Sequence, residues 1–326
     1  MPYNGTITPW MQKLFPKATA ASLQEFGWRI YEKKCSWQNP PARLPEHQIA
    51  LLMQGLDDTG KIWMNLAPAL TDDGWTVFEL RYPNDQPIEN STTYLFYKIK
   101  ELQASGIKSF VLIGHSMGGI IARNLLSSPV FHYKDCAKSG TFPTCRYLIQ
   151  IGPPNHGSSL AHMRFISEWR EHLYKLSKGQ NMIGLFLDGN GEAGNDLLPG
   201  SPFMQRLNQQ TLPKEIPVTI IAGVIAPVSN SSLFNTWKLW QRQNAIQSED
   251  QEINPQLLNK FASALGDGAV PLQSTPIKDV KDYHVFQSNH QHLVRNFRND
   301  SNRIPPAIPI IQQRLRSLLS NKGVSQ

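Results

Sequence analysis

The chain has 326 residues, of which 40% are hydrophobic and 17% charged, and 32 Lys and Arg against 25 Asp and Glu give a net charge of +7. This composition is typical of a globular protein and excludes a disordered or fibrous one, and the length suffices for a well-buried core. The basic residues are scattered, with no stripe interleaved with aromatics, so we expect no binding of nucleic acid.

Three further features concern membranes and compartment. The sequence has no run of about 18 apolar residues, so we expect no membrane-spanning helix. Residues 1–18 lack an unbroken apolar stretch and a small-residue cleavage site, which predicts no secretory signal and favours a cytoplasmic location. The surplus positive charge either favours peripheral contact with an anionic lipid surface or is simply that of a basic soluble protein. Cys136 and Cys145, which flank a short loop, either pair in an oxidising compartment or stay reduced, and Cys35 is the third cysteine.

From residue 49 onward, the chain alternates between segments typical of strands and segments typical of helices. Short apolar runs, several of them ending in Gly, predict buried strands over 49–55, 75–80, 107–114, 146–152, 216–223 and 283–288. Apolar residues at helical spacing, bounded by cap residues, Gly or Pro, predict helices over 61–74, 91–106, 118–128 and 308–323.

This alternation predicts an α/β fold with a mostly parallel sheet and helices on both faces. We expect residues 1–47 to be an N-terminal extension packed on the core and residues 48–326 to form the main domain. Two stretches longer than ordinary connections, at about 160–212 and 225–262, are predicted insertions over the active face. The first is either a lid or acyl-binding wall or a helical insertion that completes the core; its candidate wall residues are Phe165, Trp169, Leu173, Leu185 and Phe186.

The sequence VLIGHSMGG at 111–119 carries the strongest chemical signal. It contains G-x-S-x-G between a predicted strand and a predicted helix, which is the context of a nucleophile elbow. The glycines at 114 and 118 avoid clashes at a sharp turn that would expose the Ser116 hydroxyl at the end of the strand. The following helix directs its N-terminus at the reacting oxygen. Ser116 is therefore the candidate nucleophile, and His115 is expected to pack beneath the turn.

A serine nucleophile needs a base, and the base needs an orienting acid, in the chain order Ser, Asp or Glu, then His. Asp267, between two glycines in GDGAVP, is the favoured acid, and Asp196 is its chief competitor. His290 is the favoured base, because it is the first histidine after the strand at 283–288, and His292 is the alternative. His284 lies inside that strand and is expected to be structural.

The oxyanion formed in acyl transfer needs two N–H donors. The N–H of Met117, which follows the nucleophile, is the expected first donor. The second is expected from the loop after the strand at 49–55, where Gly55 permits a tight turn and Leu56 follows it. These donors belong to the main chain, so no side-chain pattern identifies them.

Four motifs together resemble a known family. GHSMGG, PPNHGS at 153–158, DLLPGSPF at 196–203, and GDGAVP followed by NHQHLV are similar to the small lipase and esterase branch of the α/β-hydrolases, which includes bacterial triacylglycerol lipases and proteins similar to GPI inositol deacylases. The resemblance covers roughly residues 48–300 and implies the α/β-hydrolase fold with Ser116, Asp267 and His290 as triad. Gln54-Gly55 stands where many relatives have His-Gly.

The predicted function is hydrolysis of carboxylic esters or lipid esters through an acyl-enzyme, without a metal or organic cofactor. Two alternatives remain open. An acyltransferase or thioesterase would use the same triad with a different acceptor or leaving group, and a non-catalytic protein would use the same fold for binding alone. The sequence does not determine the oligomeric state.

Overall fold

The computed structural model describes residues 13–14, 25–33, 36–41, 44, 48–56, 61–158, 192–225, 266–297 and 301–320. Within them, eight strands form one sheet in the spatial order β2-β1-β4-β3-β5-β6-β7-β8. The strands are β1 (Gly27–Glu32), β2 (Ser36–Gln38), β3 (Ile49–Met53), β4 (Thr76–Arg81), β5 (Ser109–His115), β6 (Thr144–Ile151), β7 (Val218–Val224) and β8 (Asp282–Gln287).

The sheet is parallel from β4 through β8, whereas β1 is antiparallel to β4 and β2 is antiparallel to β1. Each of the six predicted strands overlaps one strand from β3 to β8. The strands β1 and β2 were not predicted and lie within the expected N-terminal extension, so part of residues 1–47 belongs to the sheet itself. In β1 the apolar Trp28 and Ile30 are buried and alternate with the less buried Arg29 and Tyr31. The alternation of these residue types was the signal available in the sequence.

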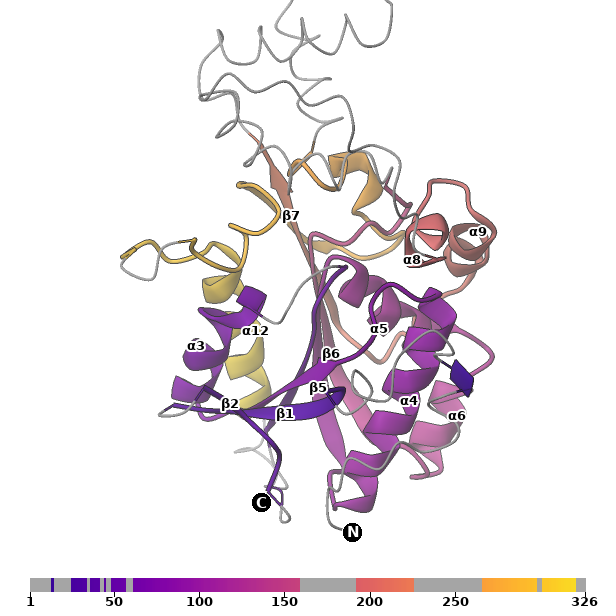
Figure 1. Ribbon diagram of the computed structural model, residues 1–326, viewed down its shortest axis with the longest axis vertical. Coiled ribbons are helices and arrows are strands. Elements are labelled where there is room, and N and C mark those ends of the chain that lie inside the picture. Colours follow the sequence, from indigo (N-terminus) through magenta and orange to yellow (C-terminus); the bar gives the residue numbers. More distant parts are fainter. Residues whose placement is uncertain are drawn as a thin grey trace, which may run out of the picture.

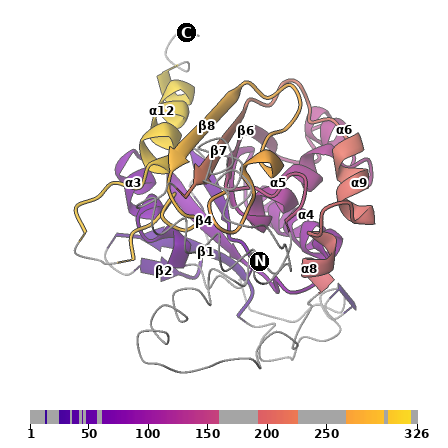
Figure 2. The same ribbon diagram turned by 90° about the horizontal axis from the view of Figure 1, so that it is seen from above.

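Helices cover both faces of the sheet (Figures 1 and 2). The helices α3 (Leu66–Asp72) and α12 (Ala307–Ser320) lie on one face, and α4 (Ile88–Ala104), α5 (Met117–Ser127) and α6 (Tyr133–Lys138) lie on the other. The helix predicted over 61–74 is divided into a 3-10 turn, η1 (Lys61–Trp63), and α3. A second 3-10 turn, η2 (Leu272–Ser274), precedes β8.

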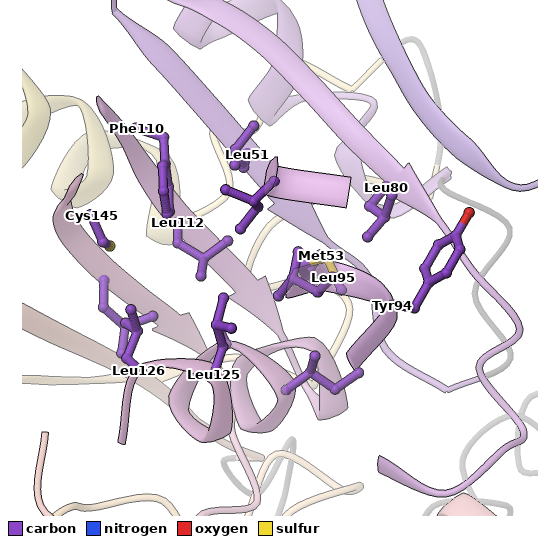
Figure 3. Packing of buried hydrophobic residues seen from close by; sticks show 14 of the residues in the cluster. Leu51, Met53, Leu80, Tyr94, Leu95, Phe110, Leu112, Leu125, Leu126 and Cys145 are labelled. Atoms are coloured by element: carbon purple, nitrogen blue, oxygen red, sulfur yellow. The ribbon is translucent and has the colours of Figure 1, made fainter. Parts of the chain in front are cut away.

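Two apolar layers hold the helices to the sheet, because successive side chains of a strand point to opposite faces. Leu51, Met53 and Leu112 pack with α4 and α5 in the first layer (Figure 3). Leu52 and Val111, their neighbours in sequence, pack with α3 and α12 in the second. This explains why the central strands read as continuous apolar runs rather than as alternating ones.

The described part of the first predicted insertion, residues 192–212, forms α8 (Glu192–Asp196) and α9 (Pro202–Gln209). Ala193, Phe203, Met204 and Leu207 are buried in the layer that contains α4 and α5, so this part of the insertion completes the core. The expected lid residues at 165–186 lie outside the described residues, as does the second predicted insertion beyond Ile225. Within the described ranges, no helix has the length and apolarity required to cross a membrane.

The buried central strands predict a large cost for truncating their side chains. Leu112→Ala, in β5 with no exposed surface, should lower the free energy of unfolding by about 2–5 kcal/mol, because it removes buried methyl groups and leaves a cavity. Val130→Ala is the control: Val130 is 76% exposed, so the change should cost less than about 0.5 kcal/mol. Urea denaturation of the two variants measures the difference, and equal losses would contradict this account of the core.

Candidate active site

Ser116 lies at the junction of β5 and α5 in a backbone conformation that L-residues rarely adopt. Its φ is 54° and its ψ is −127°, whereas β5 ends at His115 and α5 begins at Met117. The Ser116 N–H donates to the carbonyl oxygen of Ile151, and the Gly119 N–H donates to the carbonyl oxygen of Ser116. Such strain is typical of functional turns and has the form of a nucleophile elbow.

The neighbouring glycines allow α5 to start directly against the end of β3. A Cβ atom at Gly118 would lie 2.1 Å from the carbonyl oxygen of Met53, which is far inside van der Waals contact. A Cβ atom at Gly114 would lie 2.4 Å from the amide nitrogen of Gly119. Any larger residue at either position would force the helix away from the sheet.

Asp267 and His290 form a buried hydrogen-bonded pair. The His290 Nδ1 lies 2.7 Å from the Asp267 Oδ2, with Asp267 fully buried and His290 8% exposed. The other carboxylate oxygen accepts the N–H groups of Ala269 and Val270, at 2.9 and 2.8 Å. An ionised carboxylate only accepts hydrogen bonds, so Nδ1 is the donor to such a partner; in the neutral ring with this tautomer, Nε2 is an acceptor.

The end of β6 connects this pair to Ser116. Ile151 accepts the Ser116 N–H, and the next residue, Gly152, has a φ of +57°. A Cβ atom at Gly152 would lie 2.9 Å from both Nδ1 and Cε1 of His290 and 3.1 Å from the Asp267 Oδ2. One backbone segment thus contacts the serine amide on one side and the His290–Asp267 pair on the other.

His115, the residue before Ser116, also contacts His290. Their ring centroids are 4.5 Å apart, and the His115 Nε2 donates to the carbonyl oxygen of His290 at 3.2 Å. Burial, together with the nearby His290, holds the pKa of His115 well below its usual value. His115 is therefore neutral at physiological pH. The expectation that it packs beneath the turn understated its contacts, because its ring and its N–H both contact His290.

The loop after β3 passes directly beside Ser116. A Cβ atom at Gly55 would lie 2.8 Å from the Ser116 Cβ and 3.3 Å from its Oγ. The Asn84 amide donates to the carbonyl oxygen of Gly55 at 3.0 Å. Because the C=O and N–H of a trans peptide point in opposite directions, the Leu56 N–H points away from Asn84. Met117 is the first residue of α5, whose N–H groups lie at the positive end of the helix dipole.

Asn84 and Tyr82 bind the loop after β3, and the sequence analysis missed both of them. The Tyr82 hydroxyl donates to the carbonyl oxygen of Gln54 at 2.7 Å, beside the Asn84 bond to Gly55. Tyr82 directly follows β4 and Asn84 comes two residues later; because β4 is parallel to β3, both side chains reach the same edge of the sheet. Polar residues immediately after a predicted parallel strand were the available signal.

His292, the alternative base, and His284, which was expected to be structural, lie in other surroundings. The ring of His292 lies against Phe297, with 4.2 Å between centroids, and burial together with Arg303 and Arg295 lowers its pKa. His284 lies in β8, as its place in the predicted strand indicated, and its Nε2 is 2.9 Å from a carboxylate oxygen of Asp282.

The competing acid, Asp196, is the last residue of α8, and its side chain reaches the start of α4. Its Oδ2 accepts the N–H of Ile88, the first residue of α4, at 2.8 Å. Burial raises the pKa of this carboxyl above its usual value. Its contacts are those of a helix cap, and no hydrogen bond joins it to a histidine within the described part of the chain.

Cys136 and Cys145 are both free thiols, so the disulfide that their spacing allowed is not formed. Burial raises the pKa of Cys145 to about 12, so it remains protonated at physiological pH. Among the residues that the structure describes, no three His, Cys, Asp or Glu side chains are grouped so as to hold a metal ion.

Comparisons with known proteins agree with this architecture. A family model described as alpha/beta hydrolase fold matches residues 51–130. The mature form of the Bacillus licheniformis lipase BlEst2 superposes with a TM-score of 0.53 at 18% identity, over 88% of this chain and 97% of that one. The metagenomic carboxyl esterase MGS0156 gives a TM-score of 0.50 at 13% identity, over 87% of this chain and 79% of that one. No curated protein matches the chain. These likenesses confirm the predicted fold.

The adjacent glycines at the start of α5 give a matched test of the elbow. Gly118→Ala should destabilise the protein severely and distort the turn at Ser116, because its Cβ meets the backbone of β3. Gly119→Ala is the control, since its Cβ would make only ordinary contacts, at 3.4 Å, and Ala favours a helix by about 1 kcal/mol. Thermal melts of both variants measure the effect. Equal melting temperatures would show that the approach of α5 to β3 is less tight than described.

Proposed function

We propose that this chain, which has the α/β-hydrolase fold, is a serine hydrolase that cleaves carboxylic esters through an acyl-enzyme on Ser116. The observation that carries the proposal is the buried Asp267–His290 pair close to the strained Ser116. His115, which precedes Ser116, contacts the His290 ring, and Gly152, which follows the acceptor of the Ser116 N–H, also lies close to it. Two solved structures with the same fold are named as a lipase and a carboxyl esterase, which supports ester hydrolysis in general.

In the proposed cycle, the Ser116 Oγ attacks the ester carbonyl while the His290 Nε2 accepts its proton. Asp267 holds the tautomer with Nδ1 protonated and stabilises the imidazolium that forms. Its second oxygen accepts the N–H groups of Ala269 and Val270, which fixes the orientation of the carboxylate. The imidazolium then protonates the departing alcohol. Water, activated by the same histidine, hydrolyses the acyl-enzyme and restores Ser116.

The tetrahedral oxyanion is proposed to bind the main-chain N–H groups of Leu56 and Met117. The close approach of Gly55 to Ser116 brings the Leu56 peptide to the reacting atom, and Met117 stands at the N-terminus of α5. Asn84 and Tyr82 hold the preceding carbonyl groups, so the loop is fixed before the substrate arrives. Fixed donors of this kind stabilise a transition state because they need no reorganisation during the reaction.

Hydrolysis of p-nitrophenyl esters, from acetate to palmitate, tests the proposed nucleophile. Ser116→Ala should abolish the rate on every ester and also prevent labelling by a fluorophosphonate. Ser91→Ala is the control: the Ser91 hydroxyl is buried in α4 and has no hydrogen-bond partner among the described residues, so its loss should leave the rate unchanged. A maximum at long chains would indicate a lipase, and one at short chains an esterase.

Other outcomes of this assay distinguish the remaining functions. Fluorophosphonate labelling at Ser116 without ester hydrolysis would point to an acyltransferase, which uses a different acyl acceptor, or to a thioesterase, which acts on a different leaving group. The absence of both labelling and hydrolysis would contradict the proposal and leave a binding protein with a hydrolase fold. Faster hydrolysis on anionic vesicles than on dissolved esters would support a lipid substrate and peripheral contact with a membrane.

Paired substitutions test the proposed acid and base against their competitors. Asp267→Asn should lower kcat by about 10⁴, because the histidine loses the partner that sets its tautomer. Asp196→Asn should leave kcat unchanged, since Asn still accepts the N–H of Ile88. In the same way, His290→Ala should abolish activity and His292→Ala should preserve it. Steady-state kinetics of the four variants give these values of kcat. A larger loss of kcat in the Asp196 variant would assign the role of acid to Asp196, and a larger loss in the His292 variant would assign the role of base to His292.

A further inference from the structure

The segment Pro153–Ser158, which follows β6 and has the sequence PPNHGS, lies at the centre of a buried polar network. The proposed reaction gives this segment no role. Asn155 and Ser158 nevertheless have no exposed surface, although both have polar side chains. Buried polar groups that are fully hydrogen-bonded fix one arrangement of the backbone around them. The network therefore shows what this segment holds in place.

On one side, Asn155 binds the helix that carries the elbow. Arg123, in the second turn of α5, places its Nη1 3.3 Å from both the carbonyl oxygen and the Oδ1 of Asn155. Gln150, in β6, donates to the carbonyl oxygen of Gly119 at 2.7 Å and to the Asn155 Oδ1 at 3.3 Å. Arg123 and Gln150 thus connect Asn155 to α5, whose first residue follows Ser116.

On the other side, Asn155 binds the segment that carries Asp267. Its Nδ2 donates to the carbonyl oxygen of Thr275 at 2.7 Å and to the Gln150 Oε1 at 3.1 Å. Ser158 strengthens the same connection, because its hydroxyl donates to the carbonyl oxygen of Ala269 at 2.6 Å. The N–H of Ala269 in turn donates to the Asp267 Oδ1.

Only an amide satisfies all these partners. Asn155 uses its Nδ2 to donate to two oxygens and its Oδ1 to accept from two nitrogen groups, so its side chain has one possible orientation. Arg123 is nearly fully buried, and burial lowers its pKa to about 10. Within the described residues its hydrogen-bond partners are neutral oxygens, those of Asn155 and the carbonyl oxygen of Leu207. A side chain that can only accept hydrogen bonds would therefore keep the contacts to Arg123 and Gln150 and lose the one to Thr275.

We infer that Asn155 is a positioning residue that holds the Asp267 segment at a fixed distance from the nucleophile helix, and so aligns the Asp267–His290 pair with Ser116. This inference rests on the proposed function. Asn155 acts through the backbone of Thr275 and through Arg123 and does not touch the reacting atoms. Because a displacement of about 1 Å costs up to 100-fold in rate, such a link contributes to catalysis without contacting the substrate.

Asn155→Asp separates the two sides of the network. The carboxylate still accepts from Arg123 and Gln150, and it gives the buried guanidinium a counter-charge. It cannot donate to Thr275, so two oxygens face each other and the Asp267 segment is pushed away. We expect kcat to fall by about 10- to 100-fold with KM unchanged. Asn155→Ala, which removes both sides, should lower kcat similarly and serves if the Asp variant does not fold.

Asn124→Ala is the matched control, because Asn124 is also a buried asparagine next to Arg123 in α5. Its Nδ2 donates at 3.0 Å to the Thr92 hydroxyl of α4, on the side away from the Asp267 segment. Asn124→Ala and Asn155→Ala should both lower the melting temperature, because each removes a buried hydrogen-bonded amide. Only the Asn155 variants should lower kcat. A lower kcat in Asn155→Ala than in Asn124→Ala therefore separates a positioning role from a merely structural one.

A second readout does not depend on activity. The proton on the His290 Nδ1 should give a downfield ¹H NMR resonance because it is bonded to Asp267. This resonance should shift or broaden in both Asn155 variants and stay unchanged in Asn124→Ala. An unchanged resonance in folded Asn155 variants, or an unchanged kcat, would overturn the inference. If the wild-type protein hydrolyses no ester, the proposed function fails, and the resonance alone decides whether Asn155 positions the pair.

Discussion

The close meeting of three parallel strand ends is the constraint on which the candidate site depends. The strands β3, β5 and β6 are paired so that Met53 lies beside Gly114 and His115 beside Ile151. Parallel pairing brings their carboxyl ends to one edge of the sheet, where Ser116 follows β5. The elbow fits there only because residue 118 has no side chain to meet the carbonyl oxygen of Met53. Every group proposed to react is placed relative to this edge.

Main-chain groups at this edge are fixed by hydrogen bonds from side chains. Tyr82 and Asn84 bind carbonyl groups of the loop after β3. Gln150 binds a carbonyl group in the first turn of α5, and Asn155 binds one in the segment that carries Asp267. Loop backbone near a reacting centre is otherwise free to move, and movement at this edge changes the geometry of the reaction. These side-chain hydrogen bonds thus fix the loop backbone, as backbone hydrogen bonds fix strands and helices.

Burial and charge are distributed in a consistent way around His290. Asp267 is fully buried, yet its oxygens receive three hydrogen bonds, one from His290 and two from backbone N–H groups. His115, at 4.5 Å on another side, is held neutral by its own burial and adds no charge. An imidazolium formed at His290 therefore meets one fixed negative partner and a neutral ring. This arrangement suits a histidine that gains and loses a proton during a reaction cycle.

The sequence by itself determined the α/β fold, the six strands from β3 to β8 and the elbow at Ser116, because these depend on local apolar patterns and on glycines within a few residues. It also indicated Asp267 and His290, but left Asp196 and His292 open. Tertiary structure decided which carboxylate meets which histidine, because Asp267 and His290 are 23 positions apart and meet only when the loops on either side of β8 fold together. It also placed β1 and β2 in the sheet and gave Asn155 its partners, since a hydrogen bond such as that from Asn155 to Thr275 spans 120 positions and leaves no local pattern in the sequence.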